Sequence, residues 1–132
     1  MKIHQYAIMC ASIMSQEAAI EALENCQKEV EVMRADYERR RNYVVERLNE
    51  IGLPCHLPKG AFYAFPDITS TGLMSAKFSL QLLRSKKVAV VPGSAFGVSG
   101  EGFVRCCFAT GFDKLKEAMN RISEFVGEIG RR

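Results

Sequence analysis

Apolar side chains recur three, four or seven positions apart in four stretches of the chain, a spacing that places them on one face of a helix. These stretches are residues 15–26, 29–51, 75–87 and 113–129. In the first two, charged side chains occupy the opposite face, as they do on helices that meet water. The pattern therefore predicts four amphipathic helices.

The ends of these helices carry recognisable residue types. Ser15 and Asp113 are predicted N-caps, because their side-chain oxygens can accept hydrogen bonds from the free backbone amides of a first turn. Gly52 and then Pro54 end the second helix. The third helix carries one line of apolar residues, Ala76, Leu80 and Leu83. Two further apolar residues, Phe78 and Leu82, lie beside this line.

Three further stretches are rich in β-branched and aromatic residues, which predicts strands at residues 61–66, 88–91 and 103–108. The aromatic side chains of the first strand are expected in the core. Pro92 and Gly93 stop the second strand. The elements then follow the order α-α-β-α-β-β-α. This order predicts an α/β (α+β) two-layer sandwich, in which a small, mainly antiparallel sheet of about three strands carries its helices on one face.

Composition narrows the class of protein without identifying it. With 132 residues, 48% of them hydrophobic and 25% charged, the chain has the size and balance of an ordinary globular domain. A net charge of +3 is too small to indicate a nucleic acid or an anionic membrane as partner. No stretch approaches the roughly 20 apolar residues of a membrane span. We therefore expect no nucleic-acid partner and no membrane partner.

The five cysteines are odd in number, scattered and free of any CxxC pair. Cys106 and Cys107 are neighbours in a predicted strand, so their side chains point to opposite faces and are poorly placed to chelate one ion. This pattern predicts no metal site. Scattered thiols and an opening without the apolar run of a signal peptide favour a reducing, cytoplasmic location.

Arg105 is the one cation in the third predicted strand, where alternation places it on a face with Phe103, Cys107 and Ala109. A guanidinium among apolar neighbours needs an anion, because a buried charge that loses its partner costs roughly 3–5 kcal/mol. The anion is either an Asp or Glu of the same fold or a ligand. The planar fork of arginine suits the carboxylate of a small acid or amino acid, and both interpretations remain open at this point.

Three motifs follow one another at residues 59–67 (KGAFYAFPD), 88–97 (VAVVPGSAFG) and 102–110 (GFVRCCFAT), and a helix comes after the last. Together with the opening MKIHQYAIMCAS, this set resembles the C-terminal part of the class I/II, fold-type I aminotransferases that use pyridoxal phosphate (PLP). The aspartate and aromatic aminotransferase branch is the most similar. The resemblance covers nearly the whole chain but departs at Ser12-Ile13, where relatives commonly carry an Ala-Pro or Ser-Pro step.

The resemblance implies two parts: residues 1–28, a helical segment leading from a large domain, and residues 29–132, the small C-terminal domain. It places Arg105 on the arginine that binds the α-carboxylate of the amino-acid substrate. It also matches Phe96 and Gly97 to a turn near the substrate entrance, for which we expect a packing role. The small domain is expected to close over the substrate.

No lysine of this chain lies in the family's SKxxxxxGxRxG motif, whose lysine forms the Schiff base. The resemblance therefore implies no catalytic and no cofactor-binding residue here. We expect a fragment, inactive alone and without bound PLP, of a homodimeric aminotransferase that transfers an amino group between an amino acid and a 2-oxo acid. The alternatives are a stand-alone module that binds an amino acid or a protein without catalysis and, less favoured, a small nucleic-acid-binding domain.

Overall fold

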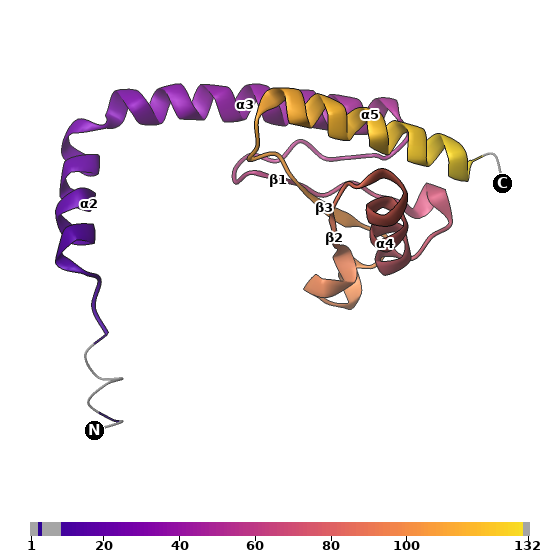
Figure 1. Ribbon diagram of the computed structural model, residues 1–132, viewed down its shortest axis with the longest axis horizontal. Helices are drawn as coiled ribbons and strands as arrows, with labels where there is room; N and C mark the ends of the chain where they lie inside the picture. Colours follow the sequence, from indigo (N-terminus) through magenta and orange to yellow (C-terminus); the bar gives the residue numbers. More distant parts are fainter. Residues whose placement is uncertain (1–2, 4–8, 131–132) are drawn as a thin grey trace. The chain divides into compact units, whose positions relative to one another are not determined.

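The computed structural model (Figure 1) describes residue 3 and residues 9–130. Most of the opening stretch MKIHQYAIMCAS, which carries part of the resemblance, lies outside the described residues. Contacts group the chain into two units, Met1–Ala35 and Asp36–Arg132. Many large apolar side chains are exposed in the described part of the first unit, whereas the second unit has a buried apolar core.

Helix α2 (Ile13–Asn25) of the first unit begins earlier than predicted. Its N-cap is Ser12 and not Ser15, because the Oγ of Ser12 accepts a hydrogen bond from the backbone N–H of Ser15 at 3.3 Å. Both serines can cap a helix, and the sequence alone does not say which one keeps an extended backbone. Ser12 has φ −60° and ψ 150°, as a residue before proline does, so Ile13 starts the helix where relatives are expected to carry proline.

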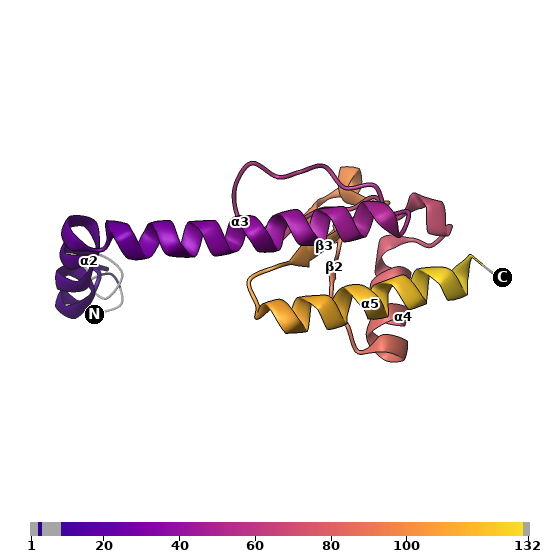
Figure 2. The same cartoon turned by 90° about the horizontal axis from the view of Figure 1, so that it is seen from above.

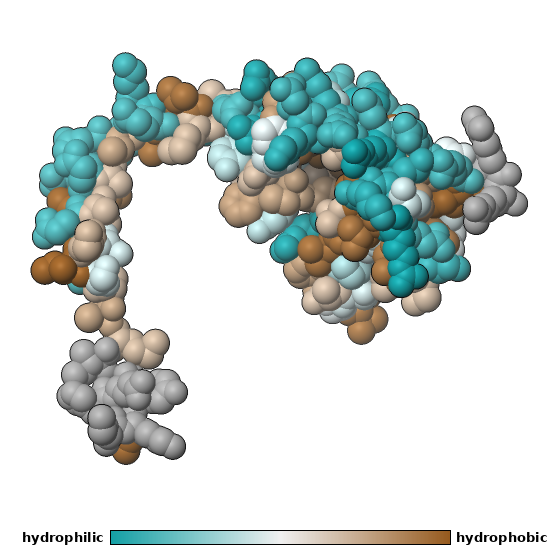
Figure 3. Space-filling model, in the orientation of Figure 1, coloured by the Kyte–Doolittle hydropathy of each residue, from teal (hydrophilic) through white to brown (hydrophobic). Residues whose placement is uncertain are grey.

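No residue of α2 is buried, although several of its side chains are apolar. Large exposed apolar side chains occur throughout the described part of the first unit, and some of them appear brown along this segment in Figure 3: Met9, Ile13, Met14, Ile20, Leu23, Val30, Val32 and Met33. A helix of 13 residues without tertiary packing is only marginally stable in water. Its apolar side therefore needs a covering surface that residues 9–35 do not supply.

The second unit contains a three-stranded antiparallel sheet with the order β1-β3-β2. Its strands are β1 (Tyr63–Ala64), β2 (Val91–Pro92) and β3 (Val104–Cys107). All three are shorter than predicted, although hydrogen bonds from Phe108 N–H to the Phe62 carbonyl oxygen and from Val104 N–H to that of Pro66 continue the contact of β1 and β3 beyond their ends. Pro92 belongs to β2 instead of preceding a break, which is possible because β2 lies at the edge of the sheet.

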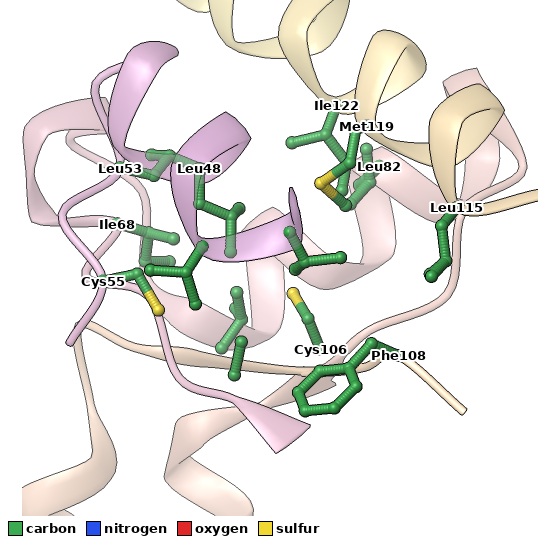
Figure 4. Packing of buried hydrophobic residues seen from close by; sticks show 14 of the residues in the cluster. Leu48, Leu53, Cys55, Ile68, Leu82, Cys106, Phe108, Leu115, Met119 and Ile122 are labelled. Carbon is green, nitrogen blue, oxygen red and sulfur yellow. The ribbon is translucent and has the colours of Figure 1, made fainter. Parts of the chain in front are cut away.

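The core lies between one face of this sheet and three helices, α3 (Gln27–Glu50), α4 (Ser75–Lys86) and α5 (Phe112–Ile129). Figure 4 shows side chains from all these elements meeting there, and the members of the sheet are Ala64, Val104 and Cys106. Figure 2 shows α4 close to α5, where the rings of Phe78 and Phe125 meet edge to face at 5.2 Å. The predicted fold class and order of elements are confirmed.

The buried side of α4 is not the line of residues that the apolar pattern suggested. Phe78 and Leu82 are buried together with Ser75 and Ser79, whereas Leu80 and its line face outward. Ser79 can be buried because its hydroxyl donates to the carbonyl oxygen of Ser75 at 2.9 Å. Two neighbouring lines of one helix differ little in hydrophobicity, so packing decided between them.

Helix α5 begins at Phe112, and its N-cap is Gly111, which has no capping side chain. The prediction of Asp113 as the N-cap was therefore wrong. Asp113 lies in the first turn, where its negative charge interacts favourably with the positive end of the helix dipole. Of the apolar stripe predicted for this helix, Leu115, Met119 and Ile122 are buried, and Phe125, which the stripe did not include, is buried with them.

Candidate functional site

Strand β3 presents Arg105 on the side of the sheet away from the core. Val104 and Cys106 are buried, whereas Arg105 is half-buried and Cys107 is exposed. This alternation confirms the predicted division of the strand into two faces. Arg105 pairs with Val91 of β2 in the sheet, so its backbone is held at the centre of the three strands.

Two aromatic rings contact the guanidinium of Arg105. Its Cζ lies 4.2 Å from the ring centroid of Tyr63 and 4.8 Å from that of Phe96. Both distances fall within the range of about 6 Å for cation–π attraction. Tyr63 belongs to β1, and Phe96 belongs to a short 3₁₀ turn, Gly93–Phe96, that follows β2. A ring stabilises the positive charge without occupying its N–H donors, so these contacts leave the fork able to bind an anion.

No Asp or Glu in the described part of the chain forms an ion pair with Arg105. Most acidic groups of the second unit pair with other cations instead, most of them on their own helix, whereas Asp67 and Glu101 accept from backbone N–H and hydroxyl groups. Of the two interpretations that the sequence left open, an internal ion pair is therefore not what the described residues form.

The aromatic side chains of residues 61–66 do not enter the core, which corrects the prediction. Phe62 and Phe65 are both exposed. The ring of Phe65 stacks on Phe103 at 5.5 Å and meets Phe96 edge-on at 5.9 Å. Alternation was correct, but it does not say which side of a strand faces the core. Here the small side chain of Ala64 points inward, and the rings of Tyr63 and Phe65 lie on the side of Arg105.

Two glycines close the turn that carries Phe96. A Cβ on Gly93 would overlap the carbonyl oxygen of Gly100, and a Cβ on Gly100 would overlap that of Gly93. The backbone N–H of Gly93 donates to the carbonyl oxygen of Phe103 at 2.9 Å, which ties the start of the turn to the sheet. Between them Gly97 has φ +113°, a conformation that favours glycine.

A carboxylate ties the same turn to the first residue of α4. One oxygen of Glu101 accepts hydrogen bonds from the backbone N–H of Ser75 at 2.6 Å and of Gly102 at 3.1 Å, and the other accepts from the Ser75 hydroxyl at 2.8 Å. The Ser75 oxygen in turn accepts from the backbone N–H of Ser94 at 3.3 Å. These bonds, above all the one from the Ser75 backbone, hold the pKa of Glu101 below its usual value.

Sequence reasoning missed the hydrogen-bonded group formed by Ser75, Ser94 and Glu101. Met74 stands at the N-cap of α4 and provides no side-chain bond, so the local sequence lacks a capping signal. The carboxylate comes from Glu101, a position 26 residues further along the chain. Only the fold brings it to the helix end.

The described residues do not fit PLP, the cofactor that the resemblance implies. A lysine that forms a Schiff base must lose its proton readily, which requires a lowered pKa. Lys86 instead pairs with Glu128 at 2.7 Å and Glu124 at 3.1 Å, and these carboxylates raise its pKa. The other lysines among residues 9–130 are exposed. No step through the cofactor is therefore assigned to this part of the chain.

Thiol and metal chemistry find no support at this site. Burial, with a smaller effect of Cys55 and Cys107, raises the pKa of the Cys106 thiol to about 12, so it stays protonated near neutral pH. Within the described residues no three His, Cys, Asp or Glu side chains gather closely enough to hold a metal ion.

Comparison with known proteins identifies the family. The model for aminotransferase class I and II matches residues 3–122. The chain belongs to the class I and II aminotransferases. An aspartate aminotransferase of Pyrococcus abyssi is 52% identical to it over 129 residues, which cover 96% of this chain and 33% of that protein. An aromatic-amino-acid aminotransferase of Thermococcus litoralis is 50% identical, with the same coverage.

The crystal structure of an aromatic aminotransferase from Pyrococcus horikoshii agrees with this aminotransferase chain at a TM-score of 0.89 and 52% identity. It matches 96% of the chain and 34% of the crystallised protein. The chain thus spans about a third of the length of its relatives. The resemblance drawn from the three motifs is confirmed. Because these relatives are named for both aspartate and aromatic amino acids, membership of the family alone does not identify a substrate.

Proposed function

We propose that this chain is the C-terminal part of a PLP-dependent aminotransferase that transfers an amino group between an amino acid and a 2-oxo acid. Residues 1–28 lead from the large domain of the parent enzyme, and residues 29–132 form its small domain. Arg105 binds the α-carboxylate of the substrate. The remainder of the parent supplies the Schiff-base lysine and holds the cofactor.

The observation that carries this proposal is the environment of Arg105. Its guanidinium is half-buried against the rings of Tyr63 and Phe96, and no carboxylate of the described residues balances its charge. A half-buried guanidinium whose donors have no acidic partner among the described residues is available to bind an external anion. A substrate carboxylate matches the fork through two parallel hydrogen bonds, which fix its position as well as its charge.

PLP, when bound in the parent, carries the amino group between the two substrates. The role of this chain is to position the substrate. Arg105 orients the carboxylate and thereby the Cα of the substrate, which converts a loose encounter into a fixed geometry. The neighbouring rings keep water from the guanidinium, so the ionic hydrogen bonds gain strength. Closure of the small domain over the substrate excludes further water.

We also propose that the parent is a cytoplasmic homodimer. The uncovered apolar side of α2 supports an assembly in which the remainder of the parent or a second copy covers it. The five cysteines are free, which suits a reducing compartment. Within the described residues, no helix has both the length and the apolar character needed to cross a membrane.

The test is Arg105→Lys in the full-length parent. An ammonium cannot reproduce the two-point fork, so kcat/KM for the amino donor should fall by an amount equivalent to about 2–4 kcal/mol. Arg40→Lys is the matched control, because Arg40 is also half-buried and also lies beside a ring, that of Tyr37. Its kcat/KM should stay within about threefold of wild type. If Arg105→Lys unfolds the protein while kcat/KM per folded enzyme is unchanged, Arg105 is structural and the proposal is wrong.

A further inference from the structure

Phe96 has an unusual position for a large apolar side chain. Half of its surface, 50%, is accessible, and it projects from a glycine-rich turn. Its ring is nevertheless held in place, because it meets the ring of Phe65 at 5.9 Å with an angle of 73° between the planes. The same ring contacts the guanidinium of Arg105. These two contacts indicate that the exposed ring of Phe96 has a role other than packing.

We propose that Phe96 is a positioning residue for Arg105, and that its ring, together with that of Tyr63, fixes the guanidinium in the orientation that binds the substrate carboxylate. This inference rests on the proposed function of Arg105. It concerns how the arginine is held before substrate arrives. Phe96 itself touches the arginine, and no contact with substrate is assigned to it.

The physical reason lies in the flexibility of an arginine side chain. An arginine side chain has many rotamers, and a binding event must remove this freedom unless the fold has already removed it. An ion pair would restrain Arg105 but would occupy the N–H groups that the substrate needs. A ring restrains the cation through its face and leaves those donors available. Two rings from separate elements therefore preorganise the fork without competing with the ligand.

The place of Phe96 depends in turn on how its turn is anchored. Ser94, two residues before Phe96, is bound through its backbone N–H to Ser75 of α4. Glu101 holds Ser75 from the other end of the turn, which includes a second 3₁₀ segment, Val98–Gly100. The orange turn next to α4 in Figure 1 is this segment of the chain. We assign to Glu101 the indirect task of keeping Phe96 against Arg105.

The experiment uses the full-length holoenzyme and measures KM and kcat separately for the amino donor. Phe96→Leu removes the ring but keeps an apolar side chain, and KM should rise roughly 5- to 30-fold while kcat stays within about threefold. Phe96→Tyr keeps the ring and should restore KM to within about threefold of wild type. Phe112→Leu is the control, because it makes the same change in a ring that lies 4.6 Å from the guanidinium of a different arginine, Arg39.

A second readout separates positioning from general packing. Phe96→Leu combined with Arg105→Lys should raise KM little beyond Arg105→Lys alone, because the ring acts through the arginine. Glu101→Gln should raise KM in the same direction as Phe96→Leu, by a smaller factor. Its effect should also be less than additive with Phe96→Leu.

Three results would overturn the inference while leaving the role of Arg105 intact. The first is a KM for Phe96→Leu no higher than that for Phe112→Leu. The second is an equal rise for Phe96→Tyr and Phe96→Leu, and the third is full additivity of Phe96→Leu with Arg105→Lys. If Arg105→Lys itself keeps the wild-type kcat/KM, the proposed function fails and this inference fails with it. The two kinds of failure are therefore distinguishable.

Discussion

Arg40 and Arg105 are both half-buried arginines beside aromatic rings, but their donor groups go to different places. Arg40 forms an ion pair with Asp36 and donates a hydrogen bond to the carbonyl oxygen of Thr110 at 2.7 Å. It also lies 5.4 Å from the ring of Tyr37. Arg105 contacts two rings at shorter distances and has no acidic partner among the described residues.

The difference shows how a fold separates a structural cation from a binding cation. Nη1 and Nη2 of Arg40 donate within the chain, and the bond from Nη1 links α3 to the segment that precedes α5. The donors of Arg105 are restrained by contacts that do not consume them. Burial and aromatic neighbours alone would not distinguish the two residues. The presence or absence of an internal acceptor does.

The largest expected change in the free energy of unfolding comes from a substitution in the turn that places Phe96 beside Arg105. Gly93→Ala places a methyl group on the carbonyl oxygen of Gly100 and should lower the free energy of unfolding by about 3 kcal/mol. Gly127→Ala is the control in α5, where a Cβ meets nothing within 4 Å. This substitution should raise the free energy of unfolding by about 0.5–1 kcal/mol, because alanine favours a helix over glycine. Urea denaturation of the 132-residue chain measures both. Equal stabilities would show that the turn is not closed in this way.

The next effect tests the comparison directly by removing each arginine. Arg40→Met should lower the free energy of unfolding by about 1.5–3 kcal/mol, because the charged hydrogen bond to Thr110 is lost. Arg105→Met should change it by less than about 1 kcal/mol, since no internal partner is left unpaired and an apolar chain suits the rings. Denaturation midpoints with unchanged m-values would measure both. A larger loss for Arg105→Met would reverse the assignment of roles.

The smallest effect is a difference in acid sensitivity. Burial alone would raise the pKa of Asp36, but hydrogen bonds and charges from Arg40 and Arg39 outweigh it and lower the pKa. A carboxyl group whose pKa falls on folding stabilises the protein above its unfolded pKa, near 3.8, and this contribution is lost as the pH falls through the folded value.

The unfolding free energy of wild type should therefore decrease more steeply below about pH 4 than that of an Asp36→Asn variant. Denaturation curves recorded from pH 6 down to pH 2.5 would compare the slopes. Arg105→Met should leave the wild-type slope unchanged, because no acidic residue of the described chain forms an ion pair with Arg105. If both variants flatten the slope equally, Arg105 has an acidic partner after all.

The fold was largely predictable from local pattern. The spacing of apolar residues gave the order of helices α2 to α5 among the described residues, and Gly52 marked the end of α3 with its φ of +82°. Alternation around Arg105 gave the correct division of β3 into two faces. The exact caps were harder, because Ser12 and Ser15 are equivalent as residue types and only backbone conformation separates them.

The sequence by itself determined the periodic elements, the grouping of Arg105 with Phe103 and Cys107 on one face of its strand, and the motifs that identify the family, because each depends on residues close together in the chain. Tertiary structure decided which side of α4 is buried, that the rings of Tyr63 and Phe96 lie beside Arg105, and that Glu101 anchors the turn of Phe96. These contacts join residues far apart in sequence. Their selection depends on packing and on satisfying polar groups throughout the unit, which no local pattern records.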